Sequence, residues 1–149
     1  MKNLKSLFIV GLLVLAACGK GGEHQHTTSD SPTDDSPNQA LYDQVMDVHD
    51  EVMPKMDDIM KLKRELQDKI ANSPDMVLER KEQLERVIAN LDSASNSMMS
   101  WMHEFNPLPD SVDQEKAREY LESEMERIRK VKTLTLESIE KAKEEATKN

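Results

Sequence analysis

Apolar residues recur at steps of three and four through most of this chain, and few folds are compatible with that pattern. Three such runs cover residues 41–70, 77–105 and 117–142. Steps of three and four place side chains on one face of an α-helix. Two short segments that contain proline, Asn72 to Asp75 and Asn106 to Pro109, separate the runs. The sequence therefore predicts three long amphipathic helices and no strand.

Helices of this kind bury their apolar faces most simply against one another. We therefore expect an all-α fold, an elongated antiparallel three-helix bundle in which the chain runs up, down and up after a disordered N-terminal tether. Only four glycines and 3% aromatic residues occur in the chain. This agrees with helices and argues against α/β folds, whose phosphate loops and strand turns use glycine. A dimer that completes a larger bundle or a coiled coil is the alternative.

The turn residues also predict where the helices begin. Ser73 precedes Pro74, and proline is favoured at the first position of a helix, so the second helix is expected to begin there. Ser111 is followed three residues later by Gln114, which resembles a capping box at the start of the third helix. Pro54 lies inside the first apolar run and lacks an amide hydrogen, so we expect a kink at this position.

Residues 1–17 have the composition of a bacterial signal peptide. Two lysines precede an apolar run from Leu7 to Leu15, which is too short to span a bilayer. Leu15-Ala16-Ala17-Cys18 resembles a lipobox, in which the cysteine thiol receives a diacylglycerol before cleavage. Cys18 is the only cysteine in 149 residues, so a chance placement explains it poorly. We expect cleavage before Cys18 and a membrane anchor made of covalent lipid on that residue.

The next segment lacks the residues that a folded core needs. From Gly19 to Asn38 no large apolar residue occurs, and Gly, Ser, Thr, Asp and Pro dominate, which is typical of disorder. A flexible coil of some twenty residues has an r.m.s. reach of roughly 25 Å. We therefore expect a signal peptide at 1–17, a lipidated flexible tether at 18–39 and a helical bundle domain at 40–149.

Charge and motif content exclude several functions. Removal of the signal peptide takes away Lys2 and Lys5 and no acid, so the formal net charge changes from −9 to −11. Nucleic-acid binding requires Lys and Arg to displace phosphate counterions, so we expect no nucleic-acid partner. The sequence also lacks a Gly-x-Ser-x-Gly elbow, a His-Glu-x-x-His motif and a phosphate loop. We expect no catalytic residue, no enzymatic activity and no cofactor beyond the lipid.

Methionines and a histidine gather on the predicted helices. His49 and Met53 share a face of the first helix, and antiparallel pairing about a turn near residue 73 brings them level with Met98 and Met102. Imidazole and thioether form a soft ligand set that suits Cu(I). The simpler interpretation is core packing, because methionine fills irregular gaps. These four residues are the candidate metal ligands.

Aromatic residues gather at the end of the predicted bundle next to the tether. Tyr42, Trp101 and Phe105 lie there, and such side chains are enriched at binding hot spots. They are the candidate contacts for a protein partner. Capping of the core is the alternative role.

Several segments together resemble a known group of proteins. HDEVMPKM, NSPDMV, MMSWMHEF and PLPDS are similar to segments of small helical lipoproteins of Bacteroidetes, of the kind often labelled "viral A-type inclusion protein". The resemblance extends over nearly all of the chain from Leu41. It implies a source and an architecture, and it favours the outer membrane over the inner one. It implies no activity, and no functional residue is carried over from it.

Three functions agree with these observations. The first is an envelope protein that presents a tethered helical bundle to a protein partner, and the second is binding of a soft metal such as copper by the Met and His cluster. The third is a structural spacer with neither partner nor ligand. A second copy of the chain is a further possible partner.

Overall fold

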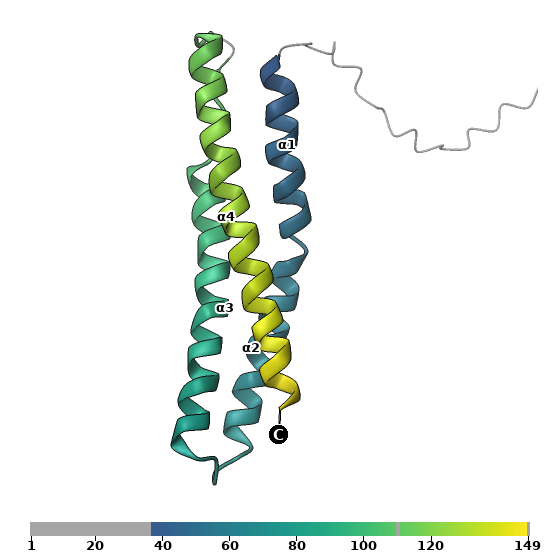
Figure 1. Ribbon diagram of the computed structural model, residues 1–149, viewed down its shortest axis with the longest axis vertical. Helices are drawn as coiled ribbons and strands as arrows, with labels where there is room; N and C mark the ends of the chain where they lie inside the picture. Colours follow the sequence, from purple (N-terminus) through teal and green to yellow (C-terminus); the bar gives the residue numbers. More distant parts are fainter. Residues whose placement is uncertain (1–36, 110, 149) are drawn as a thin grey trace, which may run out of the picture. The chain divides into compact units, whose positions relative to one another are not determined.

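The computed structural model describes residues 37–109 and 111–148, and these residues form four α-helices (Figure 1). Their bounds are α1 Pro37–Val52, α2 Lys55–Ala71, α3 Leu78–Glu104 and α4 Gln114–Thr147. The described residues contain no strand, so the predicted all-α class is confirmed. None of the four described helices has an apolar stretch long enough to cross a bilayer.

Part of the predicted organisation lies outside the described residues. This applies to the signal peptide, to Cys18 and to the tether as far as residue 36. The helical part begins at Pro37, three residues before the predicted boundary at residue 40. Asn38 is already helical, and its side-chain amide donates hydrogen bonds to the backbone oxygen and to Oε1 of Gln114, at 3.0 and 2.6 Å. These bonds hold the start of α1 against the start of α4.

The first apolar run is divided into two helices at Pro54, the position where the sequence predicts a kink. α1 ends at Val52 and α2 begins at Lys55. Met53 still donates its amide hydrogen to the His49 carbonyl oxygen, at 2.9 Å, and Met56 donates to the Met53 carbonyl oxygen, at 3.1 Å. Proline has no amide hydrogen to continue this series, which accounts for the interruption.

Buried side chains form two core clusters. The α2-side core comprises residues of α2, α3 and the end of α4, namely Ile59, Leu62, Leu66, Leu84, Val87, Leu91, Ala94, Ile139 and Ala142. The α1-side core comprises residues of α1, the end of α3 and the first half of α4, namely Val45, Val52, Met98, Trp101, Met125, Ile128 and Val131. Each predicted apolar run therefore supplies core residues.

α4 packs against each of the other three helices, but α1 and α3 are farther apart. Within the described residues, no Cα atom of α1 lies within 8 Å of a Cα atom of α3, whereas α2 and α3 do approach that closely. Large side chains bridge the wider separation, because Met98 and Trp101 of α3 pack with Val45 of α1. This wider space holds the candidate functional residues.

Two predicted helix starts are wrong. α3 begins at Leu78, with Val77 as its N-cap, and not at Pro74. The chain first makes a turn in which Met76 donates its amide hydrogen to the Ser73 carbonyl oxygen, at 3.0 Å. Val77 and Leu78 are 69% and 71% exposed. Val77 therefore does not belong to the buried face of the second helix.

The capping box predicted at the start of the last helix is also absent. Asp113 is the N-cap of α4, and its carboxylate accepts hydrogen bonds from the amides of Glu115 and Lys116, at 3.1 and 3.3 Å. Ser111 is exposed and lies two residues before that cap. A carboxylate directly before the first turn satisfies two amide donors there and also carries the charge that the helix N-terminus favours.

Candidate functional site

All four aromatic residues of the described part of the chain lie together where α1, α3 and α4 meet. The Trp101 and Phe105 rings are stacked with their centroids 4.8 Å apart. Phe105 also lies beside Tyr42, at 6.0 Å, and beside Tyr120, at 6.3 Å. The three residues predicted as partner contacts are therefore brought together, and Tyr120 joins them.

These rings differ in the surface that they offer. Trp101 is only 3% exposed and belongs to the α1-side core, so its side chain presents almost no surface to a partner. Tyr42, Phe105 and Tyr120 are half-buried. Sequence reasoning missed Tyr120, because it lies beside the apolar stripe of the last run and not on it. Only the approach of α4 to the α3–α4 loop brings it to the cluster.

A pocket of about 230 Å³ adjoins the aromatic cluster. It lies between the start of α1, the α3–α4 loop and the start of α4, and it is lined by Asn38, Gln39, Tyr42, Pro107, Leu108, Pro109, Val112, Gln114, Ala117, Tyr120 and Leu121. None of these residues is charged, although 33% of the residues of the chain are. The pocket is therefore an uncharged surface on a strongly charged molecule.

Tyr120 is fixed on the wall of this pocket. The amide of Asn106 donates a hydrogen bond to the Tyr120 hydroxyl oxygen, at 2.8 Å. Burial raises the pKa of Tyr120, and the hydrogen bond from Asn106 opposes that effect. The phenol is therefore held neutral, and its hydroxyl hydrogen remains able to donate to a ligand.

His49 and Met102, two of the four predicted metal ligands, are in direct contact. The distance between His49 Nε2 and Met102 Sδ is 3.4 Å, and His49 Nδ1 lies 2.8 Å from Asp50 Oδ1. The His49 ring also lies beside Trp101, with centroids 5.8 Å apart. Met98 is fully buried in the α1-side core, and Met53 packs against that core. The predicted pairing brings the two groups together, although His49 contacts Met102 and not the level of residue 97 that counting from residue 73 predicts.

Harder metal ions have no comparable site. Within the described residues, no group of three or more His, Cys, Asp and Glu side chains is arranged to hold a metal ion. Many carboxylates of the described helices instead form ion pairs on the surface.

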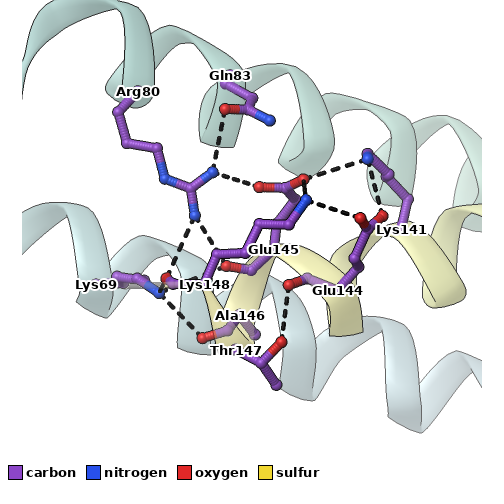
Figure 2. Close-up of polar contacts among 9 residues, drawn as sticks. All are labelled: Lys69, Arg80, Gln83, Lys141, Glu144, Glu145, Ala146, Thr147 and Lys148. Atoms are coloured by element: carbon purple, nitrogen blue, oxygen red, sulfur yellow. Dashed lines mark hydrogen bonds and ion pairs between the residues drawn. The ribbon is translucent and has the colours of Figure 1, made fainter.

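A charge cluster at the C-terminal end of α4 was not predicted (Figure 2). Glu145 is fully buried, and its carboxylate pairs with Arg80 of α3, with Lys141 of α4 and with Lys148, which directly follows α4. The Oε1 atom lies 2.9 Å from Lys148 Nζ and 3.2 Å from Lys141 Nζ. The hydrogen bonds from Arg80 and then Lys148 lower the pKa of Glu145 to about 2, so the carboxylate stays ionised at neutral pH.

The same cluster fixes the last backbone carbonyls of α4. Arg80 Nη2 donates to the Glu145 carbonyl oxygen, at 3.0 Å, and Lys69 of α2 donates to the Ala146 carbonyl oxygen, also at 3.0 Å. Lys69 also reaches the Lys148 carbonyl oxygen. Cations at this position satisfy carbonyls that have no partner within the helix and interact favourably with its negative end. Figure 2 shows the side chains from three helices meeting at this point.

Comparison of the chain with protein-family models, with curated proteins and with solved structures gave no match. The resemblance to Bacteroidetes lipoproteins therefore stays a prediction. The function has to be argued from the residues and contacts described above.

Proposed function

We propose that this chain is a lipid-anchored lipoprotein of the bacterial cell envelope whose helices form a tethered module for binding a protein partner. Lipid on Cys18 holds it to a membrane, the outer one rather than the inner one. The signal peptide and the lipobox in residues 1–18 support this location. The module has no enzymatic role and no nucleic-acid partner.

In this proposal the helices form an elongated antiparallel three-helix bundle, with α1 and α2 together as the first member. Two sets of polar contacts support this arrangement. Asn38 bonds to Gln114 at one end of α4, and Lys69 and Arg80 bond to the carbonyls at the other end. Two apolar cores lie between these contacts. The 34 residues of α4 have a length of about 50 Å at 1.5 Å per residue.

The observation that carries the interaction role is the uncharged, tyrosine-lined pocket at the start of α1. The centres of protein interfaces are depleted in charged residues and enriched in tyrosine. In a chain with net charge −9, most of the surface repels acidic partners and is strongly hydrated. No lining residue of the pocket is charged, so desolvation costs less there than over the charged helix faces, and a partner is expected to place an apolar side chain there.

The pocket also has side-chain groups that recognise a polypeptide backbone. Its lining includes the side-chain amides of Asn38 and Gln114, which bond to each other, and the hydroxyls of Tyr42 and Tyr120. Amides and hydroxyls both donate and accept hydrogen bonds, as peptide groups require. A segment of an envelope protein with one apolar anchor and an uncharged backbone around it therefore suits the pocket.

Site-specific photo-crosslinking in cells of the source bacterium tests this role. A photoreactive amino acid at Leu108, in the pocket, is expected to capture one defined partner, whereas the same group at Arg64, exposed on α2, captures none. Val112→Asp, which places a charge in the pocket, is expected to abolish the Leu108 adduct. Absence of an adduct at Leu108, or equal adducts at both positions, would contradict the proposal and leave the spacer function. An adduct with a second copy of the chain would make the partner a homo-oligomer.

The membrane anchor has a separate test. Cells grown with radiolabelled palmitate are expected to label the native chain, and Cys18→Ser is expected to remove the label and release the protein from the membrane fraction. Labelling that persists in Cys18→Ser would contradict lipidation at this residue.

A further inference from the structure

The contact between His49 and Met102 joins two helices whose backbones stay apart. His49 lies on the last turn of α1, one turn before the interruption at Pro54, and Met102 lies near the end of α3. Their side chains meet across the gap in which no pair of Cα atoms comes within 8 Å. The His49 side chain is 18% exposed, so a small ion can reach it from solvent.

The hydrogen bond from His49 to Asp50 determines whether the ring nitrogen that faces the Met102 sulfur, Nε2, carries a hydrogen. An ionised carboxylate can only accept a hydrogen bond, so His49 Nδ1 carries the hydrogen in the neutral imidazole. Nε2 then has a lone pair and no hydrogen. The Met102 sulfur is also an acceptor. Two acceptor atoms therefore face each other at 3.4 Å, an arrangement that becomes attractive when a cation lies between them.

The donor types select a soft cation. Thioether sulfur and imidazole nitrogen are ligands of Cu(I), while carboxylates and carbonyls suit harder ions. With the lengths known for zinc as a guide, roughly 2.0 Å to imidazole nitrogen and 2.3 Å to cysteine sulfur, the observed separation of 3.4 Å corresponds to an angle of about 105° at the ion. That angle belongs to trigonal or tetrahedral coordination and leaves room for further ligands. The sulfurs of Met53 and Met98 lie in the same core region.

The surroundings also resemble those of a working metal ligand. A histidine that binds a metal usually donates its other ring N–H to a carboxylate, which fixes the tautomer and the ring orientation. Asp50 takes that place here, at 2.8 Å, and the ring lies against Trp101.

From this geometry we infer that His49 Nε2 and Met102 Sδ bind one soft monovalent cation, Cu(I) in the cell envelope, at the junction of α1 and α3. This goes beyond the proposed interaction role and does not depend on it. The assignment rests on His49 and Met102.

The only tryptophan of the chain provides a direct test, because the Trp101 ring lies beside His49. Ag(I), a redox-inert analogue of Cu(I), is added to the full chain carrying Cys18→Ser, in mild detergent. The serine removes the thiol that would itself bind the ion. Tryptophan fluorescence is expected to be quenched with saturation at one equivalent. Cu(I), kept reduced and in competition with a chromophoric chelator, is expected to give the same stoichiometry.

Matched variants on that background separate the pair from the other methionines. Met102→Leu and His49→Phe keep the volume or the ring and remove the ligand atom, so each is expected to weaken binding by about tenfold or more. Met99→Leu changes an exposed methionine of the same helix and is expected to bind as the parent does. Helical circular dichroism identifies the variants that keep the fold, and either of the two ligand variants is sufficient. Binding as tight as that of the parent in a folded Met102→Leu or His49→Phe chain would overturn the inference.

Discussion

Glu145 is the side chain whose replacement gives the most quantitative test of the structure. It is fully buried at the end of α4, and its carboxylate pairs with Arg80, Lys141 and Lys148. Glu145→Gln keeps the size of the side chain and removes its charge. The Arg80 side chain, which is only 18% exposed, then loses its ionic partner. We expect the folded state of this variant to be less stable at neutral pH.

The magnitude follows from the pKa of the carboxyl group. Hydrogen bonds from Arg80 and Lys148 lower it from 4.5 to about 2. At about 1.4 kcal/mol for each pH unit between these values, the folded state favours the ionised form by roughly 3 kcal/mol. Lys141 and Lys148 are nearly half exposed, and solvent screens their contribution. The expected loss of unfolding free energy in Glu145→Gln is therefore about 2 kcal/mol.

The sign of the pH dependence is also fixed. Because the pKa of Glu145 is lower in the folded state than in the unfolded state, its contribution is complete above pH 4.5 and is lost as the pH falls toward about 2. The difference in stability between the native chain and Glu145→Gln should therefore shrink over this interval. Urea denaturation followed by helical circular dichroism, at constant ionic strength, measures it.

Glu140→Gln is the matched control. Glu140 is an exposed acid of the same helix, so its replacement changes the net charge by the same amount without touching the cluster. The expected effect at neutral pH is within about 0.5 kcal/mol. Equal stabilities of the two variants, or a difference that does not shrink in acid, would refute the reasoning from the buried carboxylate.

Three further replacements test other parts of the fold. Trp101→Ala empties the centre of the α1-side core and should reduce the free energy of unfolding by about 3 to 5 kcal/mol, measured by urea denaturation; a loss below 1 kcal/mol would place the ring at the surface. Asp113→Ala removes the N-cap of α4 and should reduce the free energy of unfolding by about 1 kcal/mol. Ser111→Ala changes the predicted cap residue, which does not cap α4, and should leave the free energy of unfolding unchanged in the same assay. Pro54→Ala should allow α1 and α2 to join and turn His49 away from Met102. Helical circular dichroism should then increase and the affinity for Ag(I) should fall. Unchanged affinity would mean that the interruption at Pro54 does not position His49 for ion binding.

The helical faces were predictable because they depend on residue spacing alone. Leu66, Leu91 and Ile128 are fully buried, and each lies on a predicted stripe. Helix ends were less predictable, because several residues near each turn are competent caps. Ser111 and Asp113 both have side-chain acceptors, and only the path of the α3–α4 loop decides that Asp113 is the cap.

The buried acids were missed although the sequence contains a signal for them. Glu145 follows Ala142 by three residues, and Glu124 follows Leu121 by three, so both lie on the apolar face of α4. Spacing alone therefore places these two carboxylates in the interior. It does not identify Arg80 as the partner of Glu145, because Arg80 is 65 residues away and is brought there by the packing of α3 on α4.

The candidate site was predictable in part for the same reason. Antiparallel pairing about a turn near residue 73 predicts His49 level with about residue 97, whereas its contact is Met102; the offset reflects the later start of α3, at Leu78. The pocket beside Tyr120 was not predictable. Its walls belong to the α3–α4 loop and to two helix starts, and no periodic pattern describes how a loop folds back.

The wider separation of α1 and α3 also affects how the molecule responds to a pulling force. A load applied through residue 37 enters the molecule at the start of α1, the helix that approaches α3 only through its side chains. The opposite end is held by the charges around Glu145 and by Lys69 on the last carbonyls. Under tension, α1 is therefore expected to peel away first and to stop at Pro54, while α2, α3 and α4 stay together. Such a pull breaks the bonds between Asn38 and Gln114 first and the contact between His49 and Met102 last before Pro54, so a stretched molecule would release a bound ion while α2, α3 and α4 stay folded.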